Sequence, residues 1–310
     1  MRTSTKHRWR SLRVWLLPPI LIGVVWYANP RALWTILAHA DPWLVALAVV
    51  ISIAASILAA TRWAAIARGL GLVAPNERLV LMYARGITTN ILLPGGTLSG
   101  DLLRSVQLSR LGNPLVRCVL SVFLDRCSGL WVLCVLSLLA AIGVVLQHGA
   151  NFAHDQIIAY LLTLTTITAA PFIPLPLDAV GRSRIVWVAA LATHWEQMRE
   201  RLRLARPALV SSVWQSLAVG LLSACTLWIC GMAVGLSVSY PVMLAAAAPI
   251  FIMAALPVGV GGFGTREVAA AIVLGLAGVE GDLAIAAALL FGLTAVLQGI
   301  LASPLFLAKA

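Results

Sequence analysis

Residues 93–104 read LPGGTLSGDLLR, and residues 256–267 read LPVGVGGFGTRE. Both stretches begin with a Leu-Pro pair, continue through a glycine-rich segment, and end with one acidic residue and one arginine. Each stretch follows a short apolar segment, residues 79–93 in the first case and 242–256 in the second. Because proline and glycine end helices and turn the chain, each stretch predicts a break between two short helices.

The rest of the chain has the composition of a membrane protein. Of its 310 residues, 61% are hydrophobic and 11% are charged, whereas soluble domains carry about a quarter charged residues. We therefore predict that residues 1–310 form a single transmembrane domain. Six apolar runs are near the roughly 20 residues that cross a bilayer, and they lie at residues 14–28, 43–66, 128–147, 157–173, 208–234 and 283–307.

The two broken units are expected to be inverted relative to each other, because the spans that precede them run in opposite directions. Paired broken helices in inverted halves are typical of a transporter site near the midplane of the membrane. We predict an all-α fold of about six full transmembrane helices plus two re-entrant hairpins, at residues 79–104 and 242–279. If the hairpin arms cross the membrane fully, the count becomes about ten.

The charge pattern indicates the orientation of the protein. The net charge of +11 comes from basic residues in short segments between apolar runs, which favours the positive-inside rule over nucleic-acid binding. Both termini are then cytoplasmic, and Arg62 is counted with the cytoplasmic basic residues. We predict a first half at 1–176, a cytoplasmic amphipathic connector at 177–206 and a second half at 207–310, in a bacterial inner membrane.

Several ionisable residues fall within the apolar part of the chain. Such residues cost several kcal/mol in a membrane, so they mark either a substrate pathway or a structural ion pair. They neutralise one another and hold the broken helices together, or their arginines bind a phosphate, and the two roles can coexist. The groups are Arg85, Asp101 with Arg104, Asp125 with Arg126, and Arg266 with Glu267.

If the site binds phosphate, we expect Arg104 and Arg266 to contact it. Asp101 and Glu267 would orient these arginines or carry a proton, and Asp125 with Arg126 would form a gating or structural pair. Half-helices that begin after a glycine would present free N–H groups to an anion, and glycines allow close approach of the backbone. The glycines expected at the site are Gly96, Gly100, Gly261 and Gly264.

Three segments together resemble the lysylphosphatidylglycerol synthase transmembrane region family, a flippase-like family of inner-membrane proteins. They are residues 93–104, residues 124–130 (LDRCSGL) and residues 256–267, and the resemblance covers nearly the whole chain. It implies a lipid-handling membrane domain. In multiple peptide resistance factors, such a domain moves aminoacylated phosphatidylglycerol outward after a fused synthase domain makes it. This sequence has Asp125 where glutamate is frequent in the family.

We therefore predict a lipid translocase (flippase) for an aminoacyl-phosphatidylglycerol, a glycolipid or a polyprenyl-linked lipid. Its expected partners are membrane lipids and a separately encoded lipid synthase or transferase, not nucleic acid. The sequence contains no catalytic motif and no metal-ligand spacing, so we expect no enzyme activity, no cofactor and no metal. Two alternatives stay open, an integral-membrane enzyme that modifies a lipid and a non-transporting partner of a lipid synthase.

Overall fold

The computed structural model describes residues 30–92, 98–148, 154–169, 186–256 and 262–306. All regular structure in these ranges is helical, which confirms the predicted all-α class. The helices are α2 (Pro30–Ala38), α3 (Pro42–Gly69), α4 (Asn76–Leu92), α5 (Leu98–Ser109), α6 (Leu115–His148), α7 (His154–Ala169), α9 (Val186–Ala233), α10 (Tyr240–Ala255), α11 (Thr265–Gly275) and α12 (Gly281–Ala302), followed by the short 3₁₀ helix η2 (Ser303–Phe306).

Four of these helices, α3, α6, α9 and α12, contain stretches long and apolar enough to cross a membrane. They correspond to four of the six predicted spans, so the chain is a multi-pass membrane protein. The fifth predicted span is represented by α7, an apolar helix of 16 residues. The sixth, at residues 14–28, lies outside the described residues, so the total of six stays a prediction.

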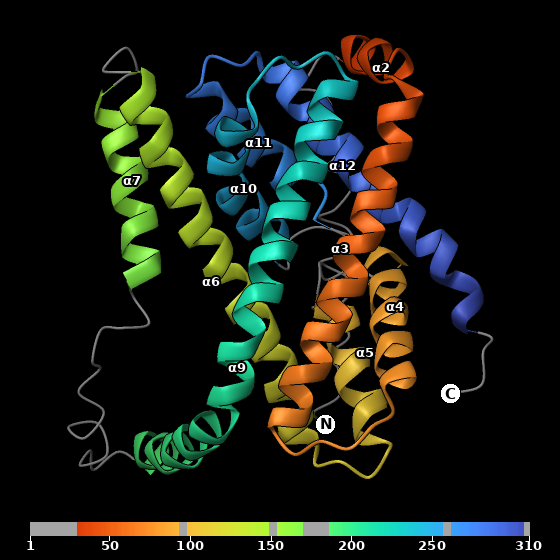
Figure 1. Ribbon diagram of the computed structural model, residues 1–310, viewed down its shortest axis with the longest axis vertical. Helices are drawn as coiled ribbons and strands as arrows, with labels where there is room; N and C mark the ends of the chain where they lie inside the picture. The colour runs from red at the N-terminus through yellow and green to blue at the C-terminus, as the bar shows by residue number, and fades with distance from the viewer. Residues whose placement is uncertain (1–29, 93–97, 149–153, 170–185, 257–261, 307–310) are drawn as a thin grey trace, which may run out of the picture.

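The described part of the predicted connector, residues 186–206, and the span that follows it form one helix. Helix α9 begins at Val186 and runs to Ala233 with Pro207 inside it. Figure 1 shows the first part of α9 turned away from its long second part. Proline removes a backbone hydrogen bond and kinks a helix, so Pro207 accounts for a bend at the predicted boundary rather than a break.

The two predicted hairpins correspond to two pairs of short helices. Helices α4 and α5 pack against each other, as do α10 and α11. Figure 1 shows α4 and α5 toward the end of the molecule where α3 ends, and α10 and α11 toward the opposite end, where α2 lies. The inverted relation of the two units stays a prediction. The connecting residues 93–97 and 257–261, including Gly96 and Gly261, lie outside the described residues, and re-entry of the hairpins stays a prediction.

Small residues allow the helices of the second half to pack closely. The buried faces of α10 and α12 include Ala246–Ala248 and Ala286–Ala288, which are at most 2% exposed. Helices in membranes associate through such small side chains because their backbones can approach each other. Large apolar side chains such as Trp43 and Ile300 remain exposed, as expected for a surface that faces lipid.

Candidate functional site

Five charged side chains from three helices form one connected ion network: Arg62 of α3, Asp101 and Arg104 of α5, and Asp125 and Arg126 of α6. Arg62 Nε lies 2.9 Å from Asp125 Oδ1, and Arg104 Nη2 lies 2.7 Å from Asp101 Oδ1. Arg126 Nε lies 2.9 Å from Asp101 Oδ2. A longer contact of 3.5 Å, between Arg104 Nη1 and Asp125 Oδ2, joins the Arg62–Asp125 pair to the other three residues of the network. Three arginines and two aspartates give the network a net formal charge of +1.

The partners within this network differ in part from the predicted ones. Asp101 and Arg104 pair, as their spacing predicts. Asp125 and Arg126 bond to other residues instead of to each other, Asp125 to Arg62 and Arg126 to Asp101. The physical reason is that these adjacent side chains in the interior of α6 point in different directions, so Asp125 reaches Arg62 of α3 while Arg126 reaches Asp101 of α5.

Arg62 is the member of the network that sequence reasoning missed. It was counted with the cytoplasmic basic residues, but it is only 5% exposed. Its Nη1 donates to Ser216 Oγ at 3.2 Å and its Nη2 to the Asp125 carbonyl oxygen at 3.1 Å. A Cβ at Gly129 would come within 2.5 Å of Arg62 Nη1, so glycine makes room for this side chain. The signal that could have found Arg62 is its position inside the apolar run at 43–66.

Arg104 lies in an aromatic environment beside the α4–α5 contact. Its guanidinium carbon is 4.9 Å from the Trp63 ring centroid and 4.6 Å from that of Tyr83, which favours the cation through the negative faces of the rings. Its buried Nη1 atom has no hydrogen-bond partner among the described residues. This Nη1 atom makes only the longer ion contact with Asp125 Oδ2 at 3.5 Å in the described part of the chain.

The glycine predicted to cradle a substrate beside this network instead packs two helices together. Gly100 is buried, and a Cβ there would lie 2.1 Å from the Gly86 carbonyl oxygen. Its N–H donates to Asn90 Oδ1 at 2.7 Å. Gly100 thus permits the close approach of α4 and α5, and its N–H is already occupied.

A cavity of about 510 Å³ lies beside the ion network. Its polar wall includes Arg62, Asp101 and Arg126 together with Tyr83, and most other lining residues are apolar side chains from α5, α6, α9 and α10. The Arg126 side chain is 42% exposed and Asp101 13%, whereas the other three charged side chains are at most 6% exposed. Arg126 is thus the charge in this network that is most accessible to a ligand.

Part of the exposed lining of this cavity is apolar. Leu98, Leu102 and Phe123 line the cavity and are also exposed on the protein surface, at 48%, 62% and 60%. They come from α5 and α6, which pack against each other. The cavity therefore combines charged groups, of which Arg126 is itself exposed, with an apolar rim at the surface.

The second hairpin contains a separate ion pair. Arg266 Nη2 lies 2.8 Å from Glu267 Oε1, and Glu267 Oε2 accepts a hydrogen bond from the Gly264 N–H at the start of α11. Arg266 and Glu267 are 3% and 0% exposed, and neither lines the 510 Å³ cavity. Among the described residues, Arg104 and Arg266 therefore do not meet in one cavity, and the Gly264 N–H is occupied like that of Gly100.

Aromatic side chains and a second glycine enclose the Arg266 side chain. Its guanidinium carbon is 4.9 Å from the ring centroid of Phe263 and 5.6 Å from that of Phe291. A Cβ at Gly292 would come within 2.0 Å of Arg266 Nη2. Gly292 thus makes room for an arginine in the second hairpin as Gly129 does beside the first.

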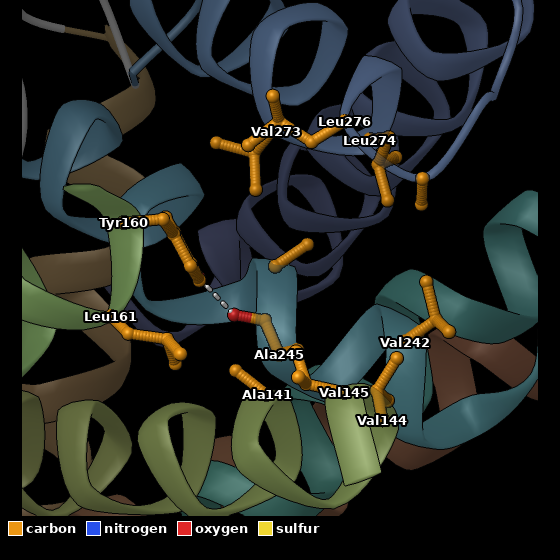
Figure 2. A pocket seen from close by; sticks show the side chains of 12 residues that line it. Ala141, Val144, Val145, Tyr160, Leu161, Val242, Ala245, Val273, Leu274 and Leu276 are labelled. Carbon is orange, nitrogen blue, oxygen red and sulfur yellow. Dashed lines mark hydrogen bonds between the residues drawn. The ribbon is translucent and has the colours of Figure 1, made fainter. Parts of the chain in front are cut away.

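A smaller pocket of about 70 Å³ lies among α6, α7, α10 and α11. Figure 2 shows that aliphatic side chains line it and that Tyr160 donates a hydrogen bond to the Ala245 carbonyl oxygen. No charged side chain is among its lining residues in the described part of the chain. This pocket offers only apolar contact.

The family model for the lysylphosphatidylglycerol synthase transmembrane region matches residues 10–302. The chain belongs to this family. Comparison with curated proteins gives no match. The match confirms the resemblance that was based on three segments of sequence.

Two of the three segments that resemble the lysylphosphatidylglycerol synthase transmembrane region family meet at the cavity. Residues 98–104 of the first segment supply Asp101 and Arg104, and residues 124–130 supply Asp125, Arg126 and Gly129. In this family member the first and second segments are thus neighbours through the ion network. The third segment forms the separate Arg266–Glu267 pair.

Proposed function

We propose that this protein moves a lipid with a polar headgroup between the two leaflets of its membrane. The observation that carries the proposal is the 510 Å³ cavity, which has a positively charged polar wall and exposed apolar side chains at its rim. A soluble-ligand site would not need an exposed apolar rim. A site for the headgroup of a membrane lipid would, because the acyl chains stay in the bilayer.

The physical task of such a protein is to lower the cost of desolvating the headgroup. A polar or charged group that leaves water without new partners costs several kcal/mol. Arg126 and Arg62 line the cavity and can donate hydrogen bonds to phosphate oxygens. We assign headgroup contact to Arg126 first, because it is the most exposed of the network's charges. Arg104 positions Asp101 through their ion pair.

Reconstitution into liposomes tests the proposal. Fluorescent phosphatidylglycerol, aminoacyl-phosphatidylglycerol and glycosyl lipids would be placed in both leaflets, and dithionite quenching would measure how much of each becomes accessible. We expect protein-dependent exchange of at least one lipid. Arg126→Gln should slow that exchange about tenfold, which corresponds to the loss of one charge-assisted contact.

The matched control is Arg117→Gln. Arg117 lies on the same helix as Arg126 and does not line the cavity, so its loss should leave exchange unchanged. Absence of exchange for every lipid would contradict the translocase. A chemically altered lipid in mass spectra of the same liposomes would favour a membrane enzyme. If the lipids are neither exchanged nor altered, a non-transporting partner of a synthase is favoured.

A further inference from the structure

The charges beside the cavity define a substrate class. We infer that the cavity selects lipids whose headgroup carries one phosphodiester anion and no balancing cation, and that Asp101 occupies the place of this anion on Arg126 when the cavity is empty. The inference rests on the proposed function in taking the ligand to be a lipid. It adds the headgroup charge and a competing carboxylate.

Charge balance favours an anionic ligand. The network holds three arginines against two aspartates, all joined by ion-pair contacts of 2.7–3.5 Å. Among the described residues of this network, one positive charge is therefore left over beside the cavity. A monoanionic headgroup neutralises it, whereas a zwitterionic headgroup brings a cation toward a wall that is already positive.

The shape of the Arg126–Asp101 contact also favours a phosphate as the ligand. Arg126 Nε and Nη2 donate to the two oxygens of Asp101 at 2.9 and 3.0 Å. This parallel pair of bonds is the arrangement in which arginine also binds two oxygens of a phosphate. Asp101 therefore presents to Arg126 the same pair of acceptors that a phosphodiester would present.

Arg126 can leave Asp101 at low cost. Arg126 is 42% exposed, while Asp101 keeps a second bond to Arg104 Nη2 at 2.7 Å. When Arg126 turns to a ligand, Asp101 thus stays paired, and a partly buried carboxylate is not left without a partner.

The other arginines are held in place. Arg62 is bonded to Asp125 and Ser216 and packed against Gly129, and Arg104 lies over two aromatic rings. Arg126 is therefore the arginine that changes partner to bind the headgroup. Asp101 competes with the ligand for it, and this competition releases the lipid after transfer.

Removing the Asp101 carboxylate from the cavity should tighten binding of an anion. A site in which Asp101 did not compete with the ligand would not show this effect. We expect Asp101→Asn to bind a short-chain fluorescent phosphatidylglycerol about tenfold more tightly than the wild type, because the competing charge is gone. The same variant should exchange the lipid more slowly in liposomes. Arg126→Gln should weaken binding, and Arg117→Gln should leave it unchanged.

The experiment uses the full chain in phosphatidylcholine nanodiscs, with fluorescence anisotropy as the readout. Short-chain phosphatidylglycerol and phosphatidylcholine of equal chain length are compared in the wild type, where we expect about a tenfold preference for the anionic lipid. Inorganic phosphate and glycerol phosphate are added as competitors. Weak competition by both supports a lipid headgroup as the ligand, and competition equal to that of the lipid would overturn the lipid assignment in favour of free phosphate.

Equal affinity of the wild type for the two lipids would overturn the inference without need of any variant. The inference would also be overturned if an Asp101→Asn protein bound phosphatidylglycerol no more tightly than the wild type while having the same elution volume and melting temperature. Failure of the proposed function is distinguishable, since the binding preferences would then appear as expected while liposomes show no exchange. Exchange without the binding preference would leave the translocase standing and remove the inference.

Discussion

The two hairpins contain similar sequence patterns but use their charges differently. In the first hairpin, Asp101 and Arg104 pair with residues of α6, through Asp125 also connect to Arg62 of α3, and lie beside a large cavity. In the second, Arg266 and Glu267 pair with each other and are almost completely buried. The comparison teaches that a charged pair after a glycine-rich break is not by itself a ligand site.

The difference follows from the spacing of the acid and the arginine. Asp101 and Arg104 are three residues apart, so they share one face of α5 and each also reaches a neighbouring helix. Glu267 follows Arg266 directly and sits at the third position of α11, where its carboxylate turns back to the Gly264 N–H in a capping box. The second pair thus satisfies itself within one helix end, which is typical of a structural role.

The largest effect should come from neutralising the acidic residue that holds buried arginines, which is Asp125 beside the first hairpin and Glu267 in the second. Asp125→Asn leaves Arg62 and Arg104 without a charged partner on α6, and Glu267→Gln leaves Arg266 alone among aromatic rings. We expect each change to lower the free energy of unfolding by about 3–5 kcal/mol, because an uncompensated buried charge remains. Denaturant unfolding in detergent micelles measures both.

Ligand binding separates the two hairpins in the same pair of variants. Glu267→Gln protein that is still folded should bind the anionic lipid like the wild type, since Glu267 does not line the cavity. Loss of binding with no loss of stability in Glu267→Gln would contradict the structural role given to the second hairpin.

A smaller effect is expected at the two glycines that make room for arginines. An alanine at Gly129 would meet Arg62 at 2.5 Å, and one at Gly292 would meet Arg266 at 2.0 Å. Overpacking of this kind costs about 1–3 kcal/mol, so both variants should melt at lower temperature. Gly129→Ala should also slow lipid exchange because Gly129 lines the cavity, whereas Gly292→Ala should act on stability alone.

The control for the glycine variants is Gly143→Ala on α6, where an added Cβ meets nothing within 4 Å. Alanine is favoured over glycine in a helix by roughly 0.5–1 kcal/mol, so this variant should be unchanged or slightly more stable. Equal destabilisation by Gly143→Ala and Gly129→Ala would show that the contact with Arg62 is not what matters.

Local features of the fold could be predicted from the sequence. The helix breaks after residues 92 and 255 follow from proline and glycine, and helices α3, α6, α9 and α12 follow from the length of their apolar runs. The Asp101–Arg104 pair also follows, because its two members are three residues apart on one helix. Each of these depends only on residues close together in the chain.

Contacts between distant segments could not be predicted in the same way. Arg62 and Asp125 are 63 residues apart, and the bond of Arg126 to Asp101 crosses from α6 to α5. Sequence reasoning paired Asp125 with its neighbour Arg126 because only the spacing was visible. It also assigned Gly100 to a ligand, whereas the structure places it against Gly86, since helix packing cannot be read from a single glycine.

The smallest expected effect tests whether the cavity beside the first hairpin holds water, as a headgroup site must. Cys127 is exposed and lines this cavity, whereas Cys225 is partly exposed outside it and Cys118, Cys134 and Cys230 are buried. A maleimide reacts with the thiolate, which forms in water and not in a hydrocarbon environment. We therefore expect Cys127 to be modified several times faster than Cys225, as followed by mass spectrometry, and bound phosphatidylglycerol to slow this modification modestly because Cys127 follows Arg126 directly in α6. Equal rates at Cys127 and Cys225 would mean that both thiols face lipid, and the first hairpin would then be as closed to headgroups as the second.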